Sequence, residues 1–151
     1  MVEFGTSPSF DAKGYHLSII EKQNGRFVVY ADVDGLRYFQ DRILDASHSR
    51  GGDDHGVVDV NGDRQFKVGA AKLTVIRLFI DAPPRVSPPH TPPMAYRMPG
   101  KVLEMAIRFA DAEQLFEALG RMADKISNGQ TVGRIALTYG LSIAYLANWT
   151  S

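Results

Sequence analysis

Hydrophobic and polar positions alternate over residues 15–22 and again over residues 27–31. Alternation with a period of two is typical of a strand that buries one face. The pair Asn24-Gly25 lies between the two runs, and it accepts the positive φ angles of a tight type I′ turn. The pattern therefore predicts a β-hairpin at the start of the chain.

A helical pattern follows this hairpin. Asp32 or Asp34 is a suitable N-cap, because an aspartate side chain can accept a hydrogen bond from the first free amides of a helix. Apolar residues then recur at helical spacing, which predicts one buried stripe. The stripe consists of Leu36, Phe39 and Ile43.

The middle of the chain reads as a loop and three strands. Residues 45–56 are polar and glycine-containing, without a period, which indicates a loop. Residues 57–60 and 63–68 read as strands on either side of the turn pair Asn61-Gly62. Residues 72–81 are dense in β-branched side chains and predict one long strand.

A proline-rich segment separates that strand from the last regular pattern. Residues 83–99 contain seven of the eight prolines, so we expect an extended loop outside the sheet. Residues 102–109 alternate again as a strand. Asp111 and Gln114 then resemble a capping box at the start of a second helix. The apolar stripe of this helix is Leu115, Phe116, Leu119, Met122 and Ile126, and Asn128-Gly129 ends it.

Two parts of the chain share this order of elements. Residues 30–45 align without gaps on residues 109–124, with five identities in sixteen positions. The alignment predicts duplicated β-β-α units over residues 15–46 and 72–127. We therefore expect one α+β domain over residues 1–151, with a mainly antiparallel sheet and helices packed on one face.

Composition and charge narrow the function classes. The net charge is zero, which argues against a nucleic-acid partner, and the absence of cysteine excludes disulfides and thiolate metal sites. No basic and apolar leader is visible at the start, so we expect a cytoplasmic protein without a membrane segment. Residues 32–63 carry eight acids against three arginines. Such an acidic region can attract a basic partner.

The stretch over residues 130–150 has three interpretations. Its Gly129-Gln-Thr, Ile135-Ala, Tyr139-Gly-Leu-Ser and Leu146-Ala-Asn motifs resemble the first half of a LysM module, which implies binding of N-acetylglucosamine-containing glycans. The spacing of Ala136, Gly140, Leu141, Leu146 and Trp149 also resembles a helix-turn-helix. However, residues 135–151 contain no charged side chain, so we expect a buried core element rather than a DNA reader. The stretch is also too short, and too rich in Thr, Ser, Asn and Gly, for a membrane anchor.

No catalytic or phosphate-binding motif is present, and we expect neither a cofactor nor a metal. His48 and His55 with Asp53 and Asp54 match no regular metal-binding spacing. A small enzyme would have to assemble its active site from scattered residues.

These observations favour a non-catalytic protein-binding module of the inhibitor or immunity-protein kind. The alternatives are a DNA-binding regulator that uses residues 132–149, and a small enzyme without a recognisable motif. An exposed edge strand would also allow a homodimer. The acidic residues expected to steer a basic partner are Asp41, Asp45, Asp53 and Asp54. The residues expected to supply its buried contacts are Met94, Tyr96 and Met98.

Overall fold

The computed structural model describes residues 8–22, 25–48, 56–61, 71–81, 93–147 and 149. Within them lie two helices, α1 (Val33–Ser47) and α2 (Phe109–Ser127). The strands are β1 (Leu17–Glu21), β2 (Phe27–Ala31), β3 (Gly56–Asp59), β4 (Ala71–Leu73), β5 (Val75–Ile80), β6 (Met94–Met98), β7 (Val102–Ile107), β8 (Ile135–Ala136) and β9 (Leu141–Tyr145).

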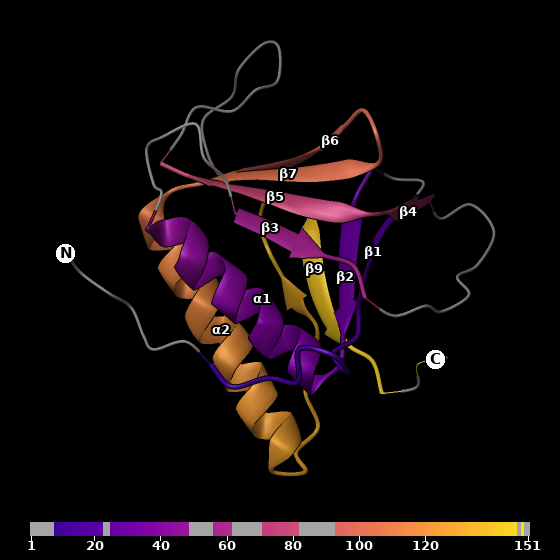
Figure 1. Ribbon diagram of the computed structural model, residues 1–151, viewed down its shortest axis with the longest axis vertical. Helices are drawn as coiled ribbons and strands as arrows, with labels where there is room; N and C mark the ends of the chain where they lie inside the picture. Colours follow the sequence, from indigo (N-terminus) through magenta and orange to yellow (C-terminus); the bar gives the residue numbers. More distant parts are fainter. Residues whose placement is uncertain are drawn as a thin grey trace.

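The strands form two sheets (Figure 1). Sheet A has the order β4-β1-β2-β9-β8, and sheet B has the order β3-β5-β7-β6. One pair in each sheet is parallel, β2 with β9 and β5 with β7, and the other pairs are antiparallel. The predicted α+β class with mainly antiparallel strands is therefore confirmed, although the strands are divided between two mixed sheets.

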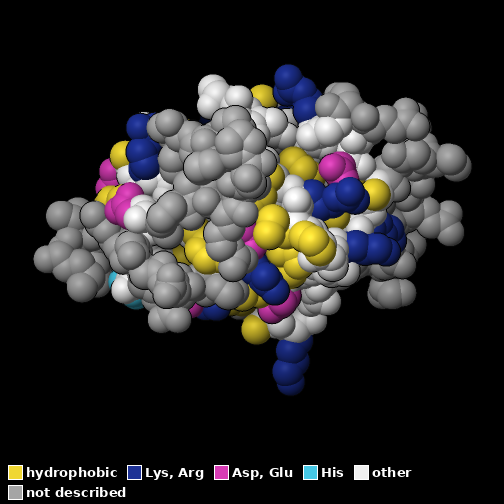
Figure 2. Space-filling model, turned by 90° about the horizontal axis from the view of Figure 1, so that it is seen from above, with side chains coloured by type: hydrophobic (Ala, Val, Ile, Leu, Met, Phe, Trp, Pro, Cys, Tyr) yellow, Lys and Arg dark blue, Asp and Glu magenta, His cyan; other side chains and the backbone are white. Residues whose placement is uncertain are grey.

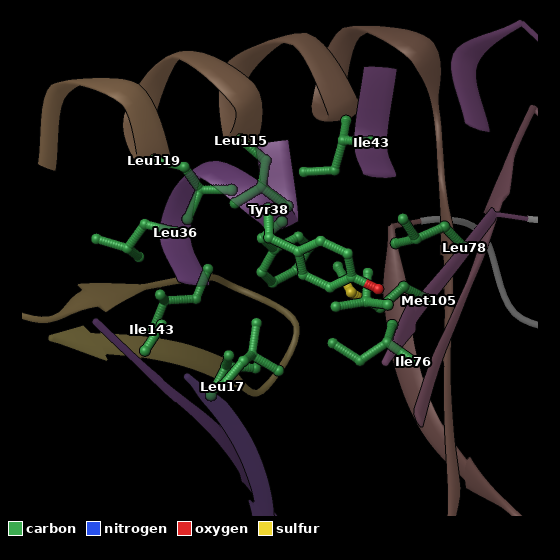
Figure 3. Packing of buried hydrophobic residues seen from close by; sticks show 14 of the residues in the cluster. Leu17, Leu36, Tyr38, Ile43, Ile76, Leu78, Met105, Leu115, Leu119 and Ile143 are labelled. Atoms are coloured by element: carbon green, nitrogen blue, oxygen red, sulfur yellow. The ribbon is translucent and has the colours of Figure 1, made fainter. Parts of the chain in front are cut away.

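A single large core lies between the helices and the two sheets. Figure 3 shows side chains from α1 and α2 and from both sheets pointing toward one another. The apolar stripes predicted for the helices account for this, since their residues at helical spacing are buried. The fully buried large side chains include Phe39, Leu36 and Ile43 of α1, Leu115 and Leu119 of α2, Ile76 and Leu78 of β5, and Leu103, Met105 and Ile107 of β7.

Sheet A combines strands from both ends of the sequence, whereas the strands of sheet B all lie between residues 56 and 107. The hairpin β1-β2 is extended by β9 and β8, while the antiparallel pair β6-β7 is extended by β5 and β3. Each helix follows one of these two pairs, α1 after β2 and α2 after β7. This shared connectivity agrees with the order predicted for a repeat, but it does not confirm a duplication, which stays a prediction.

The first hairpin and the start of α1 agree with the sequence analysis. Leu17 pairs with Ala31 in the β1-β2 ladder, and the Asp32 side chain accepts a hydrogen bond from the amide of Gly35 at 2.7 Å. Asp32 is therefore the N-cap. The helix continues to Ser47, so the expected loop begins later than residue 45. The strand expected over residues 63–68 lies outside the described residues.

The start of α2 differs from the expected cap. The helix begins at Phe109, and Asp111 occupies its third position, where its carboxylate accepts the amide of Arg108 at 3.0 Å. The amide of Phe109 donates a hydrogen bond to Oδ1 of Asp81, the residue after β5, at 3.0 Å. Two aspartates thus satisfy amides that helical hydrogen bonds leave free.

The prediction of a single strand over residues 72–81 is wrong. Residues 71–73 form β4 in sheet A, and residues 75–80 form β5 in sheet B. The chain crosses between the sheets at Thr74, whose amide and hydroxyl both donate to the carbonyl of Lys101, at 2.9 and 3.2 Å. The β-branched composition gave the correct element type, but it carries no information about where a strand changes sheets.

The prediction of a loop over residues 83–99 is wrong for residues 94–98. Met94–Met98 form β6, an antiparallel partner of β7, with Tyr96 opposite Glu104. The five residues between Pro93 and Pro99 contain no proline, so each retains the amide that a strand ladder requires. Residues 83–92 lie outside the described part of the chain.

The stretch over residues 130–150 forms strands in its described part. Strand β9 lies between β2 and β8 in sheet A, and Leu141 and Ile143 are fully buried. Strand β9 therefore belongs to the core, whereas no residue of 130–140 is buried. Residues 130–147 contain no helix, so the helix-turn-helix interpretation is wrong. Of the motifs that resemble a LysM module, Ile135-Ala forms β8, and Tyr139-Gly-Leu-Ser leads into β9, which pairs with it.

Lys101 adopts a positive φ of 61° in the turn between β6 and β7. A side chain in this left-handed region costs about 1 kcal/mol relative to glycine. We therefore expect Lys101→Gly to raise the free energy of unfolding by about 1 kcal/mol in urea denaturation. The neighbouring Gly100 has a φ of 87°, so Gly100→Ala is the opposite test and should lower stability by a similar amount. If the two variants changed the free energy of unfolding in the same direction, this turn geometry would be contradicted.

Candidate functional site

The outer face of sheet B, which points away from the core, is largely apolar. Leu103, Met105 and Ile107 of β7 belong to the core, so the alternate residues of β7 point to the opposite side. The strand register places the outward residues of β3, β5 and β6 on that same side. The outer face consists of Val57, Val75, Arg77, Phe79, Met94, Tyr96, Met98, Val102, Glu104 and Ala106.

Glu104 lies at the centre of this face and is completely buried. The hydroxyl of Tyr96 donates to Glu104 Oε1 at 2.9 Å, and Arg77 Nη1 lies 3.9 Å from Glu104 Oε2. A buried carboxylate needs such partners, because its desolvation is costly without them. The carboxylate in turn fixes the orientation of the Tyr96 ring on β6.

Strand β6 forms one edge of sheet B, and among the described strands it pairs with β7. Its outward side chains are Met94, Tyr96 and Met98, which are all half-buried. Figure 2 views the molecule from the side on which β6 lies in Figure 1, and it shows hydrophobic side chains gathered beside Lys and Arg. An edge strand with apolar alternate residues is suited to receiving a partner chain.

Basic side chains border β6 at its turn into β7. Arg97 pairs with Glu21 of β1 at 3.4 Å and remains half exposed, and Lys101 is exposed. A hollow of about 480 Å³ lies at this turn. In the described part of the chain it is lined by Arg97, Met98, Pro99, Gly100 and Lys101.

The structure does not bring the predicted aspartates together with the apolar residues of β6. Asp41 and Asp45 lie on α1, which packs on the core side of sheet B, while Met94, Tyr96 and Met98 point to the outer side. Asp53 and Asp54 lie outside the described residues. The predicted steering residues and the predicted contact residues thus belong to different surfaces.

Arg42 partly neutralises the two aspartates of α1. Its Nη2 lies 2.9 Å from Asp41 Oδ2, and its Nη1 lies 3.4 Å from Asp45 Oδ2. Burial lowers the pKa of Arg42, but the hydrogen bond and the charges of these carboxylates outweigh burial and raise it above its usual value. The aspartates therefore offer a partner less negative charge than their number suggests.

Three aromatic rings pack where the segment before β1 meets α1. Tyr15 and Tyr38 stack with ring centres 4.1 Å apart, and Phe10 meets both edge-on. The amide of Asp59 donates to the Tyr38 hydroxyl at 2.9 Å. Burial, followed by the hydrogen bond to Tyr38, raises the pKa of Tyr15 well above its ordinary value. Both tyrosines are buried, so this cluster anchors the segment to the core.

A second polar cluster lies at the end of the β1-β2 ladder. His16 Nδ1 lies 2.7 Å from Asp32 Oδ2, and the imidazole stacks on Trp149, with ring centres 5.4 Å apart and an angle of 20° between the planes. Sequence reasoning found no partner for His16. The predicted hairpin contained the signal, because a register that pairs Leu17 with Ala31 also places His16 opposite Asp32.

Within the described residues, no group of three His, Cys, Asp or Glu side chains is arranged to hold a metal ion. His48 is the exposed C-cap residue of α1, whereas His55, Asp53 and Asp54 lie outside the described part of the chain. No protein-family model, curated protein or solved structure matches this chain. Any function must therefore be argued from the geometry of these surfaces.

Proposed function

We propose that this protein is a non-catalytic protein-binding module of the inhibitor or immunity-protein kind, and that it binds its partner through the edge strand β6. The observation that carries the proposal is the edge strand β6, with Met94, Tyr96 and Met98 half-buried on an apolar sheet face.

The chemistry of this surface is that of a protein interface. The edge of a strand offers backbone amides and carbonyls to an extended segment, and its alternate side chains supply specificity. Tyrosine and methionine are enriched at interface centres, and the bond from Tyr96 to Glu104 reduces the entropy that Tyr96 would lose on binding. The exposed Lys101 at the turn into β7 favours a partner with an acidic group beside the apolar centre.

The basic partner predicted from the acidic region involves a separate surface. Asp41 and Asp45 on α1 would act through long-range attraction, which speeds association and weakens with added salt. Exchanging both for asparagine would then change the salt dependence of association and leave the contacts at β6 intact.

Among the described residues, no helix is long and apolar enough to span a membrane.

The test compares three versions of the full chain as bait in the native organism. The wild-type chain should retain one protein in stoichiometric amount, and Met98→Lys should lose it, because a charge at the centre of an apolar contact must be desolvated. Captured proteins are quantified by mass spectrometry after nuclease treatment.

The matched control is Gln114→Lys, which places the same charge on the exposed surface of α2. It should retain the partner as the wild-type chain does. Far-ultraviolet circular dichroism and thermal unfolding verify that both variants fold. If the folded Met98→Lys chain retained the partner, β6 would not be the interface. If the wild-type chain retained no protein, the binding-module proposal would fail as a whole.

A further inference from the structure

We propose that the partner binds by adding an extended segment antiparallel to β6, with a large aliphatic residue opposite Ala95. This inference rests on the proposed binding through β6 and specifies what that edge receives. Its basis is sheet A, where β4 occupies the edge that corresponds to β6.

The two sheets share one pairing scheme once β4 is set aside. Sheet A then has the order β1-β2-β9-β8, and sheet B has the order β6-β7-β5-β3. In both, the first and last pairs are antiparallel and the middle pair is parallel. In both, the hairpin is followed along the chain by a helix and then by two strands that join the other sheet. This correspondence is one of pairing, and it requires no common origin of the two halves.

The correspondence also holds residue by residue. The shift in residue number that takes Ile19 of β1 to Ala95 of β6 takes the partner strand β2 to β7 in the same register. The same shift takes Gly25, in the turn of the first hairpin, to Lys101, in the turn of the second. Both have a positive φ, of 77° and 61°. The two hairpins therefore match in their ladders and in their turns.

Equivalent positions of the two halves also contact each other. By the same shift, Arg97 is the counterpart of Glu21, and Phe116 is the counterpart of Gln40. Arg97 Nη1 lies 3.4 Å from Glu21 Oε1, and Gln40 Nε2 donates to the carbonyl of Phe116 at 2.8 Å. A two-fold relation between two units produces such contacts between equivalent positions.

Strand β4 is where the two sheets differ. It pairs antiparallel with β1, and its last residue, Leu73, lies opposite Ile19. Both side chains belong to the core cluster. Among the described strands, none pairs with the corresponding edge of β6 (Figure 1). A further antiparallel strand on β6 would give sheet B the same arrangement as sheet A.

The backbone of Ala95 faces this edge. In β1, the amide and the carbonyl of Leu17 bond to Asn61, on the side away from β2. Because the hydrogen-bonding direction alternates along a strand, Ile19 faces the same side as Leu17. Ala95 is the counterpart of Ile19, so its amide and carbonyl are directed toward a strand that adds to β6.

The side chain of Ala95 sets the size of the partner residue opposite it. Ala95 is half-buried and packs against the core at the position that Ile19 occupies in sheet A. Alanine covers less apolar surface than isoleucine. The partner residue opposite Ala95 must therefore be a large aliphatic one to cover this end of the core as fully as Ile19 and Leu73 cover the other.

The other side of the added strand meets different side chains. The next partner residue lies opposite Tyr96, with Met94 and Met98 on its diagonals, which favours an apolar or β-branched side chain. An acidic residue beyond it would lie toward the exposed Lys101. The occupant is thus an extended apolar segment with an acidic residue at its amino-terminal end.

The first test uses the synthetic peptide acetyl-Glu-Thr-Val-Leu-Val-Thr-Lys-amide, designed to place its leucine opposite Ala95. It should shift the backbone NMR signals of β6 in the isotope-labelled full chain, with a dissociation constant of about 1 mM. In the antiparallel register the leucine amide faces β6 and the valine amides face away. N-methylation of the leucine amide should weaken binding about tenfold, whereas N-methylation of the preceding valine should change it by less than about twofold.

The second test changes the protein. Ala95→Pro removes one outward amide, and an edge strand tolerates proline on its open side. This variant should lose both the peptide and the protein captured by the wild-type chain. Ala95→Ser keeps the amide and is the matched control, which should bind both as the wild-type chain does. Circular dichroism and thermal unfolding verify that the two variants fold.

The outcomes separate this inference from the proposed function. Equal binding of the two methylated peptides, or no shift of β6 signals at about 10 mM of the unmodified peptide, would overturn strand addition. If folded Ala95→Pro kept the captured protein that Met98→Lys loses, β6 would remain the interface and strand addition alone would fail. If the wild-type chain bound the peptide but captured no protein, the proposed function would fail and the strand-receiving edge would stand. Self-association in sedimentation that Ala95→Pro abolishes would identify a second copy as the occupant and overturn the assignment to a partner's segment.

Discussion

Replacing Gly35 with alanine is expected to lower the free energy of unfolding by about 3 kcal/mol, measured by urea denaturation at neutral pH. Gly35 lies in the first turn of α1, and a Cβ atom there would overlap the carbonyl oxygen of His16 and lie 3.0 Å from Cβ of Ala31. The carbonyl cannot move freely, because it accepts the amide of Asp32 at 3.1 Å.

Helix propensity alone predicts that Gly35→Ala would raise the free energy of unfolding. Alanine is favoured over glycine inside a helix by about 1 kcal/mol, so an uncrowded site would gain stability. Gly133→Ala is the matched control, because a Cβ at Gly133 has no neighbour within 4 Å, and its effect should stay within about 0.5 kcal/mol. A Gly35→Ala chain as stable as the wild type would show that α1 does not approach the His16 carbonyl this closely.

Truncating Ile143 to alanine should cost about 3 to 4 kcal/mol in the same measurement. Ile143 is fully buried in β9 and belongs to the core cluster, which contains residues of both sheets and of both helices. Removal of its side chain loses apolar burial and leaves a cavity in the core. A loss of this size would identify residues 141–145 as part of the core.

Ser142 provides the control for Ile143. It is the preceding residue on the same strand and points to the other face of sheet A, opposite Val28. Ser142→Ala should change stability by no more than about 0.5 kcal/mol. Similar losses for both variants would mean that β9 has no single buried face, contrary to the packing seen in Figure 3.

The local elements were largely predictable from the sequence. The strands β1 and β2, the Asp32 cap and the apolar stripe of α1 are encoded by neighbouring residues, whose pattern has one simple solution. The same holds for β7 and α2 and for the Asn128-Gly129 stop, where Gly129 has a φ of 77°. Short-range chemistry determines each of these features.

Features that depend on distant residues were not predictable. The division of residues 71–80 between two sheets depends on the carbonyl of Lys101, which no local pattern around Thr74 encodes. Likewise, the proline content around residues 83–99 concealed a strand, because the proline-free run of β6 becomes a strand only where β7 lies beside it. Pairing between distant segments is decided by the whole fold.

The candidate site was predictable in part. Met94, Tyr96 and Met98 were selected as apolar residues in a proline-rich segment, and the structure places them on one sheet face. Their buried neighbour Glu104 was assigned only to the polar side of an alternating strand. Its contacts with Tyr96 of β6 and Arg77 of β5 depend on strand pairing, which the sequence pattern around Glu104 does not encode.

The parallel pair β2-β9 has a consequence for synthesis of this protein. Residues 27–31 emerge from the ribosome long before residues 141–145, yet β9 is their neighbour in sheet A. Until β9 is available, one edge of the β1-β2 hairpin offers unpaired amides and carbonyls together with apolar side chains such as Phe27 and Val29. Domains rich in distant contacts fold slowly for the same reason. The nascent chain therefore exposes an aggregation-prone edge until residues 141–145 have emerged and paired with β2.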